Sequence, residues 1–278
     1  MRVILISLGT LFVMGILILM VRIWGMSQTF PEYPHEFFNA GPVTTIVKAD
    51  TLDKVRAILA KKSDAVIWVD VRISKDKVAF SLPPARDREF LDMKKKLQDE
   101  NPQTPILIGG KLSEYPWEQI NEFYKTTPAL KEYYEQFPQT RFVLNVVDNV
   151  LDVHTAVISA IEGLNPDKRT MIQSEANVIM TAIKDLKPMW VYGTGTPDLV
   201  RMLSFDSLYV LPAIQFKGDV FIAPIQISKR PAFNADVIAE MRRRHKKIFL
   251  GPLTSADDIK KAQEFNPDGY IYENLEQF

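Results

Sequence analysis

The sequence predicts an α/β fold, a (β/α)8 TIM barrel with an inserted helical segment, preceded by one N-terminal transmembrane helix. Strand-like runs rich in β-branched residues alternate with segments of helical period, and eight main strands follow residue 42. No Gly-x-Gly-x-x-Gly loop follows any of them. Helices between consecutive strands imply parallel pairing, and eight strands without that loop favour a closed barrel over a doubly wound sheet.

The composition limits the class of protein. With 278 residues, 46% hydrophobic and 24% charged, the chain is typical of a folded protein with a sizeable core. Lys plus Arg equals Asp plus Glu at 34 each, so we expect no nucleic-acid partner. The absence of cysteine excludes thiolate metal sites and a cysteine nucleophile. Only His35, His154 and His245 could carry histidine acid/base chemistry.

Residues 3–21 form an uncharged apolar run of nineteen residues. At 1.5 Å per residue, a helix of this length spans the roughly 30 Å hydrocarbon core of a bilayer. Arg22 and Trp24 follow, and both residue types anchor such helices at the interface. We expect residues 1–25 to be an uncleaved single-pass membrane anchor, with a cleaved signal peptide as the alternative. The small charge bias favours a barrel on the exported side, periplasmic or extracellular.

The remaining chain divides into a linker and a barrel. Residues 26–42, with Pro31, Pro34 and Pro42, are predicted to form an irregular linker before the barrel at residues 43–278. Residues 83–140 interrupt the alternation as an insertion with a charged helix at 86–100, a short strand at 105–108 and aromatic-rich helical pieces at 117–134. The eight barrel strands are expected at residues 43–47, 65–73, 141–147, 170–173, 189–192, 219–222, 247–250 and 269–272, with a short additional strand at 78–82.

Ligands of such barrels bind at the carboxyl ends of the strands. A turn at residues 192–197 carries two glycines before a helix, and it either cradles an anion with its backbone amides or only ends a strand. The basic run at residues 242–247 is either a solvated helix end or a contact with anionic headgroups. The residues at the expected strand ends are Lys48, Asp70, Asn145, Ser174, Tyr192, Gly251 and Glu273.

Residues 63–78 read Ser-Asp-Ala-Val-Ile-Trp-Val-Asp-Val-Arg-Ile-Ser-Lys-Asp-Lys-Val. This stretch resembles the second strand and following hairpin of the glycerophosphodiester phosphodiesterase family, a branch of the phospholipase-C-like phosphodiesterase barrels. Residues 111–120 resemble the segment before that family's insertion helix, and residues 141–147, 170–174 and 269–273 fall where three of its strands lie. The resemblance is diffuse and covers roughly residues 43–278.

The resemblance implies a metal-dependent phosphoric diester hydrolase of lipid metabolism. The family uses a His-Arg pair after the first strand, a Glu and an Asp that hold a divalent cation, a second His and a further Glu. In this sequence Lys48 stands near the end of the first strand without His-Arg, Trp68 takes the Glu position, and Asp70 keeps the Asp. Pro83 with the next proline replaces His-Asp, and Asn145 replaces the Glu of Glu-x-Lys. The catalytic residues are therefore unknown, and we expect a degenerate enzyme.

Three functions remain open. The first is a membrane-anchored, non-catalytic barrel that serves as a binding or scaffold module for a phosphorylated lipid-derived small molecule or a protein. Its ligand-binding residues at the barrel mouth are predicted to be Lys48, Asp70, Arg72, Asn145 and Ser174. The second is an active hydrolase whose rearranged site holds Mg²⁺ or Ca²⁺, and the third is a protein-interaction platform on the aromatic insertion. Under the second reading the metal ligands are Asp70, Asp148 and Glu273.

Overall fold

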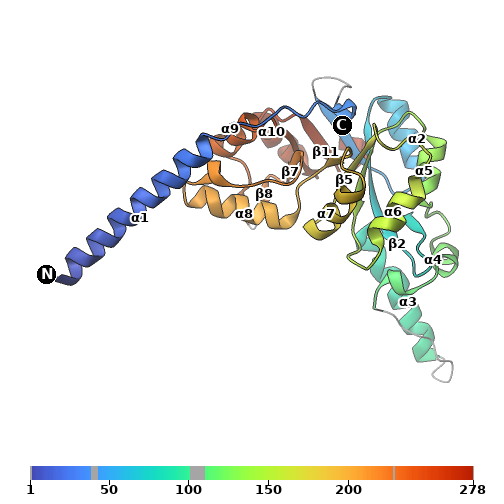
Figure 1. Cartoon of the computed structure of the whole chain (residues 1–278). Helices are drawn as coiled ribbons and strands as arrows, with labels where there is room; N and C mark the ends of the chain where they lie inside the picture. Colours follow the sequence, from blue (N-terminus) through green and yellow to red (C-terminus); the bar gives the residue numbers. More distant parts are fainter. Residues whose placement is uncertain (1, 39–42, 101–109, 228, 278) are drawn as a thin grey trace.

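The computed structural model describes residues 2–38, 43–100, 110–227 and 229–277. Its centre is a nearly closed barrel of parallel strands in the order β6-β5-β4-β2-β1-β11-β10-β7 (Figure 1). The predicted TIM barrel is confirmed, and each predicted barrel strand overlaps an observed one. The barrel strands are β1 (Thr44–Lys48), β2 (Val66–Ile73), β4 (Phe142–Val146), β5 (Thr170–Gln173), β6 (Val191–Tyr192), β7 (Val220–Ala223), β10 (Lys247–Leu253) and β11 (Gly269–Tyr272).

Helices between these strands cover the outside of the barrel. Side chains at their N-termini satisfy backbone groups that a helix leaves unpaired. The Thr51 hydroxyl accepts a hydrogen bond from the Lys54 N–H at 3.3 Å, and the Ser255 hydroxyl accepts one from the Asp258 N–H at 3.1 Å. The helices are α2 (Leu52–Lys61), α5 (Leu130–Gln136), α6 (Val153–Ile161), α7 (Asn177–Leu186), α8 (Thr196–Ser207), α9 (Ala235–Arg243) and α10 (Ala256–Glu264).

The barrel closes between β6 and β7, the two ends of the ladder of paired strands. The Asp219 N–H donates to the Tyr192 carbonyl at 2.7 Å, and the Asp219 carboxylate accepts from the Tyr192 N–H at 3.0 Å. The buried Thr194 hydroxyl donates to the Val220 carbonyl at 2.7 Å and accepts from the Ile222 N–H at 3.3 Å. Between β6 and β7 the side chains of Asp219 and Thr194 thus make hydrogen bonds that backbone groups of adjacent strands make with each other elsewhere in the barrel.

Inward-facing side chains fill the barrel, as the alternation of side chains along each strand requires. All of them come from barrel strands except Phe37, which belongs to the short helix η1 (Glu36–Phe38) before β1. Arg141 at the start of β4 donates to the Phe37 carbonyl at 2.5 Å and holds this segment at the N-terminal end of the barrel. The interior cluster consists of Phe37, Ile46, Val66, Trp68, Val143, Met171, Val191, Val220, Ile222, Phe249 and Ile271.

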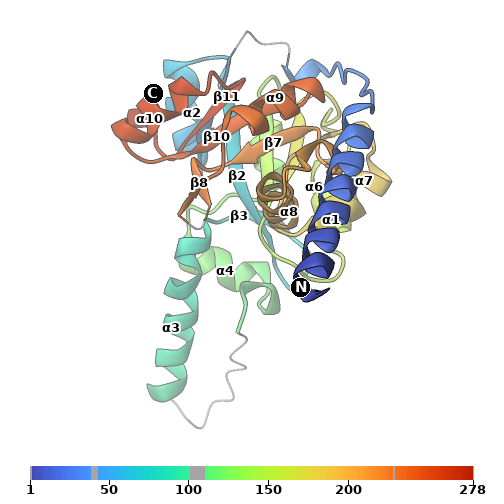
Figure 2. The same cartoon turned by 90° about the vertical axis from the view of Figure 1, so that its left-hand side faces the viewer.

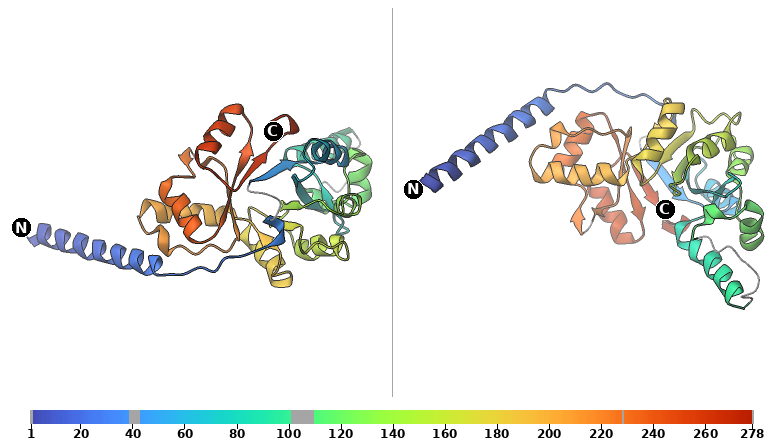
Figure 3. Two further views of the ribbon diagram at one scale, coloured as in Figure 1. Left: turned by 90° about the horizontal axis from the view of Figure 1, so that it is seen from above. Right: turned by 60° about the horizontal axis from the view of Figure 1, so that its bottom comes forward.

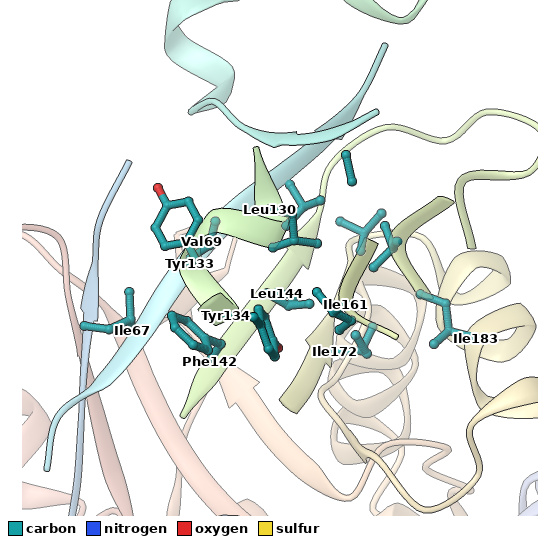
Figure 4. Close-up of a cluster of buried hydrophobic side chains, with 14 of the residues drawn as sticks. Ile67, Val69, Leu130, Tyr133, Tyr134, Phe142, Leu144, Ile161, Ile172 and Ile183 are labelled. Atoms are coloured by element: carbon teal, nitrogen blue, oxygen red, sulfur yellow. The ribbon is translucent and has the colours of Figure 1, made fainter. Parts of the chain in front are cut away.

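Outward-facing side chains of the strands pack beneath the surrounding helices (Figure 4). Val69 of β2 and Leu144 of β4 belong to the same buried cluster as the tyrosines of α5. The rings of Tyr133 and Tyr134 lie 6.2 and 4.7 Å from the ring of Phe142, measured between centroids. These two tyrosines therefore contribute to the core and leave no aromatic surface for a partner at α5.

The short strand β3 (Ala79–Ser81) pairs antiparallel with β2 and leads into the insertion, which runs through η2 (Pro84–Arg86), α3 (Asp87–Glu100), η3 (Leu112–Glu114) and α4 (Trp117–Tyr124). Figure 2 shows α3 pointing away from the barrel. The Phe90 ring lies 4.9 Å from that of Tyr115 and 5.5 Å from that of Phe123. The aromatic residues here form a small core of their own. The strand predicted at residues 105–108 lies outside the described residues.

One pair of short strands was not predicted from the sequence. β8 (Gln226–Ile227) and β9 (Arg230–Pro231) form an antiparallel pair after β7. Two residues per strand are too few for an alternating pattern to be recognised.

The N-terminal helix α1 (Arg2–Met26) projects from one side of the barrel (Figure 3). Its segment Ile6–Met26 is long and apolar enough to cross a membrane, and its most apolar window is not buried in the structure. A signal sequence near an N-terminus has the same properties. The segment after α1 runs past α9 before it reaches η1 (Figure 1).

We predict that Phe37→Ala destabilises the barrel by about 3–5 kcal/mol, because the ring is fully buried and its loss leaves a cavity in the interior. Chemical denaturation in detergent micelles, followed by intrinsic fluorescence, measures the change. Leu151→Ala, at a side chain that is 81% exposed, is the control and should cost less than about 0.5 kcal/mol. Equal effects of the two substitutions would contradict a core role for Phe37.

Candidate functional site

The candidate site is the carboxyl end of the barrel, where β1, β2 and β4 lie side by side. Lys48 is paired in register with Trp68, and Asp70 with Asn145. Because side chains alternate along a strand and Trp68 faces the interior, Asp70 faces the interior one layer nearer the mouth. The expectation that Lys48, Asp70 and Asn145 meet at one end of the barrel agrees with this register.

Asp70 is held by two neighbouring side chains. Its Oδ1 atom accepts hydrogen bonds from the Trp68 indole N–H at 3.0 Å and from the Asn145 amide at 2.7 Å. The residue is only 9% exposed, so these donors replace most of the water that a surface carboxylate would have. Trp68 and Asn145, which stand where the resembling family has carboxylates, therefore bind the one carboxylate that is kept.

The two lysines of the mouth are paired with carboxylates. Lys48 Nζ lies 2.8 Å from a Glu273 carboxylate oxygen, and Lys54 Nζ lies 2.5 Å from an Asp50 oxygen. These four side chains and Asp70 line a cavity of about 210 Å³. Asp50 and Lys54 were missed in the sequence analysis. Their position just after β1 was the available signal, because residues that follow a barrel strand commonly reach the mouth.

Arg72 lies beyond the mouth and links the barrel to the insertion. Its guanidinium donates to Asp148 Oδ1 at 2.6 Å and to a carboxylate oxygen of Asp87, the first residue of α3. Asp148 also accepts from the Ile73 N–H at 3.0 Å. Arg72 is 5% exposed, and its guanidinium forms ion pairs with both of these carboxylates. The predicted binding residue Arg72 and the predicted metal ligand Asp148 are thus partners of each other.

Burial raises the pKa of Asp87 to about 6, and the nearby Asp148 charge adds to the rise, while the Arg72 guanidinium opposes it. The loss of hydration outweighs the ion pair because the Asp87 carboxylate, at the start of α3, is partly buried against Arg72 of β2 rather than in open solvent. Asp87 Oδ1 is buried and has no hydrogen-bond partner among the described residues. Asp87, which joins the insertion to the barrel, therefore becomes charged as the pH rises through about 6.

Ser174 and the turn after β6 serve the structure of the barrel. The Ser174 hydroxyl is buried, donates to the Val146 carbonyl at 2.8 Å and accepts from the Ala176 N–H at 3.2 Å. In the turn at residues 192–197, the Thr194 hydroxyl closes the seam between β6 and β7. Asp198 in the first turn of α8 is buried, and a negative charge there opposes an anion at this helix N-terminus. The anion cradle is therefore not supported.

Gln173 is a second residue that the sequence analysis missed. It pairs in register with Asn145, so it faces the interior in the same layer. Its amide N–H donates to the Thr194 carbonyl at 2.9 Å, and its buried Oε1 has no partner within the described residues. A Cβ atom at Gly193 would lie 1.9 Å from this Oε1, so Gly193 is needed for the close approach. Gln173 could have been recognised as a mouth residue from the sequence, because it is the last residue of the predicted strand at 170–173.

Two of the three histidines lie away from the mouth, beside the segment that precedes β1. The His35 ring nitrogen Nε2 lies 3.0 Å from the Met189 carbonyl, and His245 Nδ1 lies 3.7 Å from a Glu32 oxygen. His154 lies on α6, outside the barrel. None of these three positions brings an imidazole to the cavity at the mouth.

The residues at the mouth do not fit the divalent cation that the resemblance implies. Among the residues that the structure describes, no group of three or more His, Asp or Glu side chains is arranged to hold a metal ion. Asp70, Asp148 and Glu273 each face a donor of the protein itself. Lys48 also places a positive charge beside Glu273, and a Mg²⁺ or Ca²⁺ site needs several oxygen ligands with net negative charge.

Comparison with solved structures defines the fold. A Silicibacter pomeroyi protein assigned as a glycerophosphoryl diester phosphodiesterase superimposes with a TM-score of 0.62 at 14% identity, over 87% of this chain and 94% of that one. The glycerophosphodiester phosphodiesterase from Agrobacterium tumefaciens gives 0.58 at 12% identity, over 85% and 98%. An Oleispira antarctica phosphodiesterase, solved with its product sn-glycerol-3-phosphate, gives 0.55 at 11%, over 82% and 92%.

The chain therefore has the fold of glycerophosphodiester phosphodiesterases, as the sequence resemblance predicted. No protein-family model and no curated protein matches the sequence. At 10–14% identity the agreement concerns the fold, and the residues of the mouth decide the chemistry.

Asp87→Asn is predicted to gain stability relative to the wild type as the pH rises. The folded chain holds the Asp87 proton up to a pKa of about 6, above the usual 3.8, so the stability this proton provides is lost as the pH rises through the higher value. Asn cannot ionise. Thermal denaturation at about pH 4.5 and pH 7.5 should show the melting temperature of the variant rising relative to wild type. Asp53→Asn, at an exposed side chain of α2, is the control. A pH-independent difference for Asp87→Asn would contradict the raised pKa.

Proposed function

We propose that this chain is a membrane-anchored barrel of the glycerophosphodiester phosphodiesterase fold that no longer hydrolyses phosphodiesters and acts as a binding or scaffold module. The pairing of the mouth carboxylates with protein donors carries this proposal. Asp70 is bound to Trp68 and Asn145, and Glu273 is bound to Lys48. Hydrolysis would need a cation or an acid/base group at the same place.

The proposed ligand of the mouth is a phosphorylated lipid-derived small molecule. Lys48 and Lys54 line the cavity of about 210 Å³ and supply the positive charge that a phosphate requires. Such a ligand would compete with Glu273 and Asp50 for these lysines. A protein partner is the other proposed occupant of the module, but it would have to use residues other than the buried aromatic rings of the insertion.

The uncleaved anchor is supported by the contacts of the last turn of α1. Gly25 is packed so closely on η4 (Leu211–Ala213) that a Cβ atom there would lie 2.3 Å from the Pro212 carbonyl carbon. Arg243 of α9 donates to the Gly25 carbonyl at 3.2 Å and to the Gln28 carbonyl at 2.8 Å. A signal peptide is discarded, so contacts between its last turn and the folded domain serve no purpose in the mature chain.

Hydrolysis is tested with glycerophosphocholine, glycerophosphoethanolamine and a chromogenic diester in the presence of Mg²⁺, Ca²⁺ or Mn²⁺. We expect no activity and no metal-dependent shift of the melting temperature, because Lys48 stands beside the carboxylate that a cation would need. Metal-dependent hydrolysis that Asp70→Ala abolishes would overturn the proposal in favour of the active hydrolase. Asp53→Ala, on the outside of α2, controls for an unspecific effect of removing a carboxylate.

Anchoring is tested by fractionation of cells that produce the full chain. We expect the protein in the membrane fraction after carbonate washing, with residues 1–26 still present by mass spectrometry. A soluble chain that lacks this segment would show a cleaved signal peptide. The proposed exported orientation is tested with Met189→Cys, at a residue that is 68% exposed. The native chain has no cysteine, so a membrane-impermeant maleimide added to intact cells or spheroplasts should label only this position.

A further inference from the structure

The last turn of α1 is attached to the barrel at a corner formed by the end of α8 and the start of η4. We call residues 207–209 the α8 corner. Gly25 packs on Pro212, and Arg243 donates to the Gly25 and Gln28 carbonyls, as described above. Arg22 Nη1 also donates to the Tyr209 carbonyl at 3.4 Å. The end of α1 is therefore packed against the barrel. The direction of α1 determines which part of the surface of the barrel lies nearest the membrane in the proposed anchoring.

The contact between Arg22 and Tyr209 sets the depth of the α8 corner. The membrane-crossing segment ends at Met26, four residues after Arg22, which is about 6 Å along a helix axis. Trp24, 55% exposed, lies between them at the position of an interfacial anchor. Tyr209 therefore lies beside the final turns of the apolar helix, which the proposed anchoring would place at the level of the lipid headgroups.

Tyr209 has a left-handed backbone conformation at the end of α8. After α8 the Val210 N–H donates to the Phe205 carbonyl and the Tyr209 N–H to the Asp206 carbonyl, both at 3.0 Å, which is the Schellman arrangement. Tyr209 has a φ of 59° in the left-handed position that normally favours glycine or asparagine. A tyrosine there strains the backbone by about 1 kcal/mol, yet the residue is 71% exposed, so burial within the protein offsets little of the strain.

We propose that the α8 corner enters the headgroup layer of the bilayer that α1 crosses, as a second contact of the barrel with lipid. This inference rests on the proposed membrane anchoring. Leu208, 57% exposed, and Tyr209 present an aliphatic and an aromatic side chain together. A tyrosine ring is favoured at the boundary between headgroups and hydrocarbon, where its ring is apolar and its hydroxyl remains hydrated. The lipid supplies the burial that the protein does not.

The test uses single cysteines, which are unique because the native chain has none. The full-length variants Ser207→Cys, Val13→Cys and Met189→Cys carry one environment-sensitive fluorophore each. They are reconstituted into vesicles of phosphatidylcholine and phosphatidylglycerol that contain nitroxide-labelled lipid. Ser207 is an exposed residue of the α8 corner and leaves Tyr209 intact, Val13 lies within α1, and Met189 is exposed beside His35.

We expect lipid nitroxides to quench the Val13 probe strongly, the Ser207 probe to an intermediate degree, and the Met189 probe least. Quenching of Ser207 no greater than that of Met189, while Val13 is quenched, would overturn the lipid contact of the α8 corner and leave the anchor intact. A Val13 probe that lipid does not quench would overturn the anchoring and this inference with it.

Tyr209→Asn separates a lipid contact from a purely structural role. Asparagine suits the left-handed position, so the barrel should remain at least as stable in detergent, while quenching of the Ser207 probe should fall toward that of Met189. Unchanged quenching in this variant would contradict the role of Tyr209.

Gly25→Leu tests whether the packing of α1 on η4 sets the depth. Its side chain clashes with Pro212, so the Ser207 signal should fall while the Val13 signal stays. Quenching of Ser207 that survives this substitution would show that the docking does not place the α8 corner.

Discussion

The carboxyl end of the barrel depends on one constraint, which is that a charge removed from water must be given a partner. An unpaired buried carboxylate costs several kcal/mol, so a barrel with acidic groups at its mouth needs either a bound cation or donors from its own chain. Here the buried Asp70 has the Trp68 and Asn145 N–H groups, the largely buried Asp148 has Arg72, and the more exposed Glu273 has Lys48. Because the protein itself supplies these partners, the mouth needs no bound cation to balance its carboxylates.

The strands and the mouth could be predicted because both follow from local pattern. A run such as β2, which is apolar up to Asp70 and buried along its whole length, identifies a barrel strand, and the strand end identifies the mouth. Side-chain direction could not be predicted beyond that point, because it depends on register. Arg72 lies two residues after Asp70 on the same strand but extends past the mouth to Asp87 and to Asp148, and Asp148 is 76 residues away in sequence. Gln173 shares the interior layer of Asn145. Ser174 follows it by one residue, so the Ser174 side chain does not share that layer.

The relation between anchor and barrel could not be deduced from hydropathy, which treats α1 and the barrel as separate parts. Prolines after α1 suggested a linker, but Phe37 at the end of that segment fills the barrel interior, and Arg243 binds carbonyls at its beginning. The basic run at residues 242–247 therefore helps to attach α1 to the barrel, a role that differs from both predictions for it, a solvated helix end and a contact with anionic headgroups. Arg243 caps α1, and Arg244 donates to the Pro212 carbonyl at 2.8 Å beneath it. The Arg243 contacts join residues more than two hundred positions apart and the Arg244 contact joins residues 32 apart, so local pattern reveals neither.

Trp68 ties the mouth to the core of the barrel, and this limits which side chains its position accepts. Trp68 is 7% exposed, fills the interior and donates to Asp70, so replacing it with a carboxylate would remove core volume and a donor together while adding a third negative charge. Lys48 would still occupy the position beside Glu273, where a cation would have to bind. Because Trp68, Asp70 and Asn145 are in contact, the effects of replacing them are not expected to add. The core role of Trp68 and the Lys48–Glu273 pair are therefore the two features of the mouth that favour the proposed binding or scaffold module over the active hydrolase.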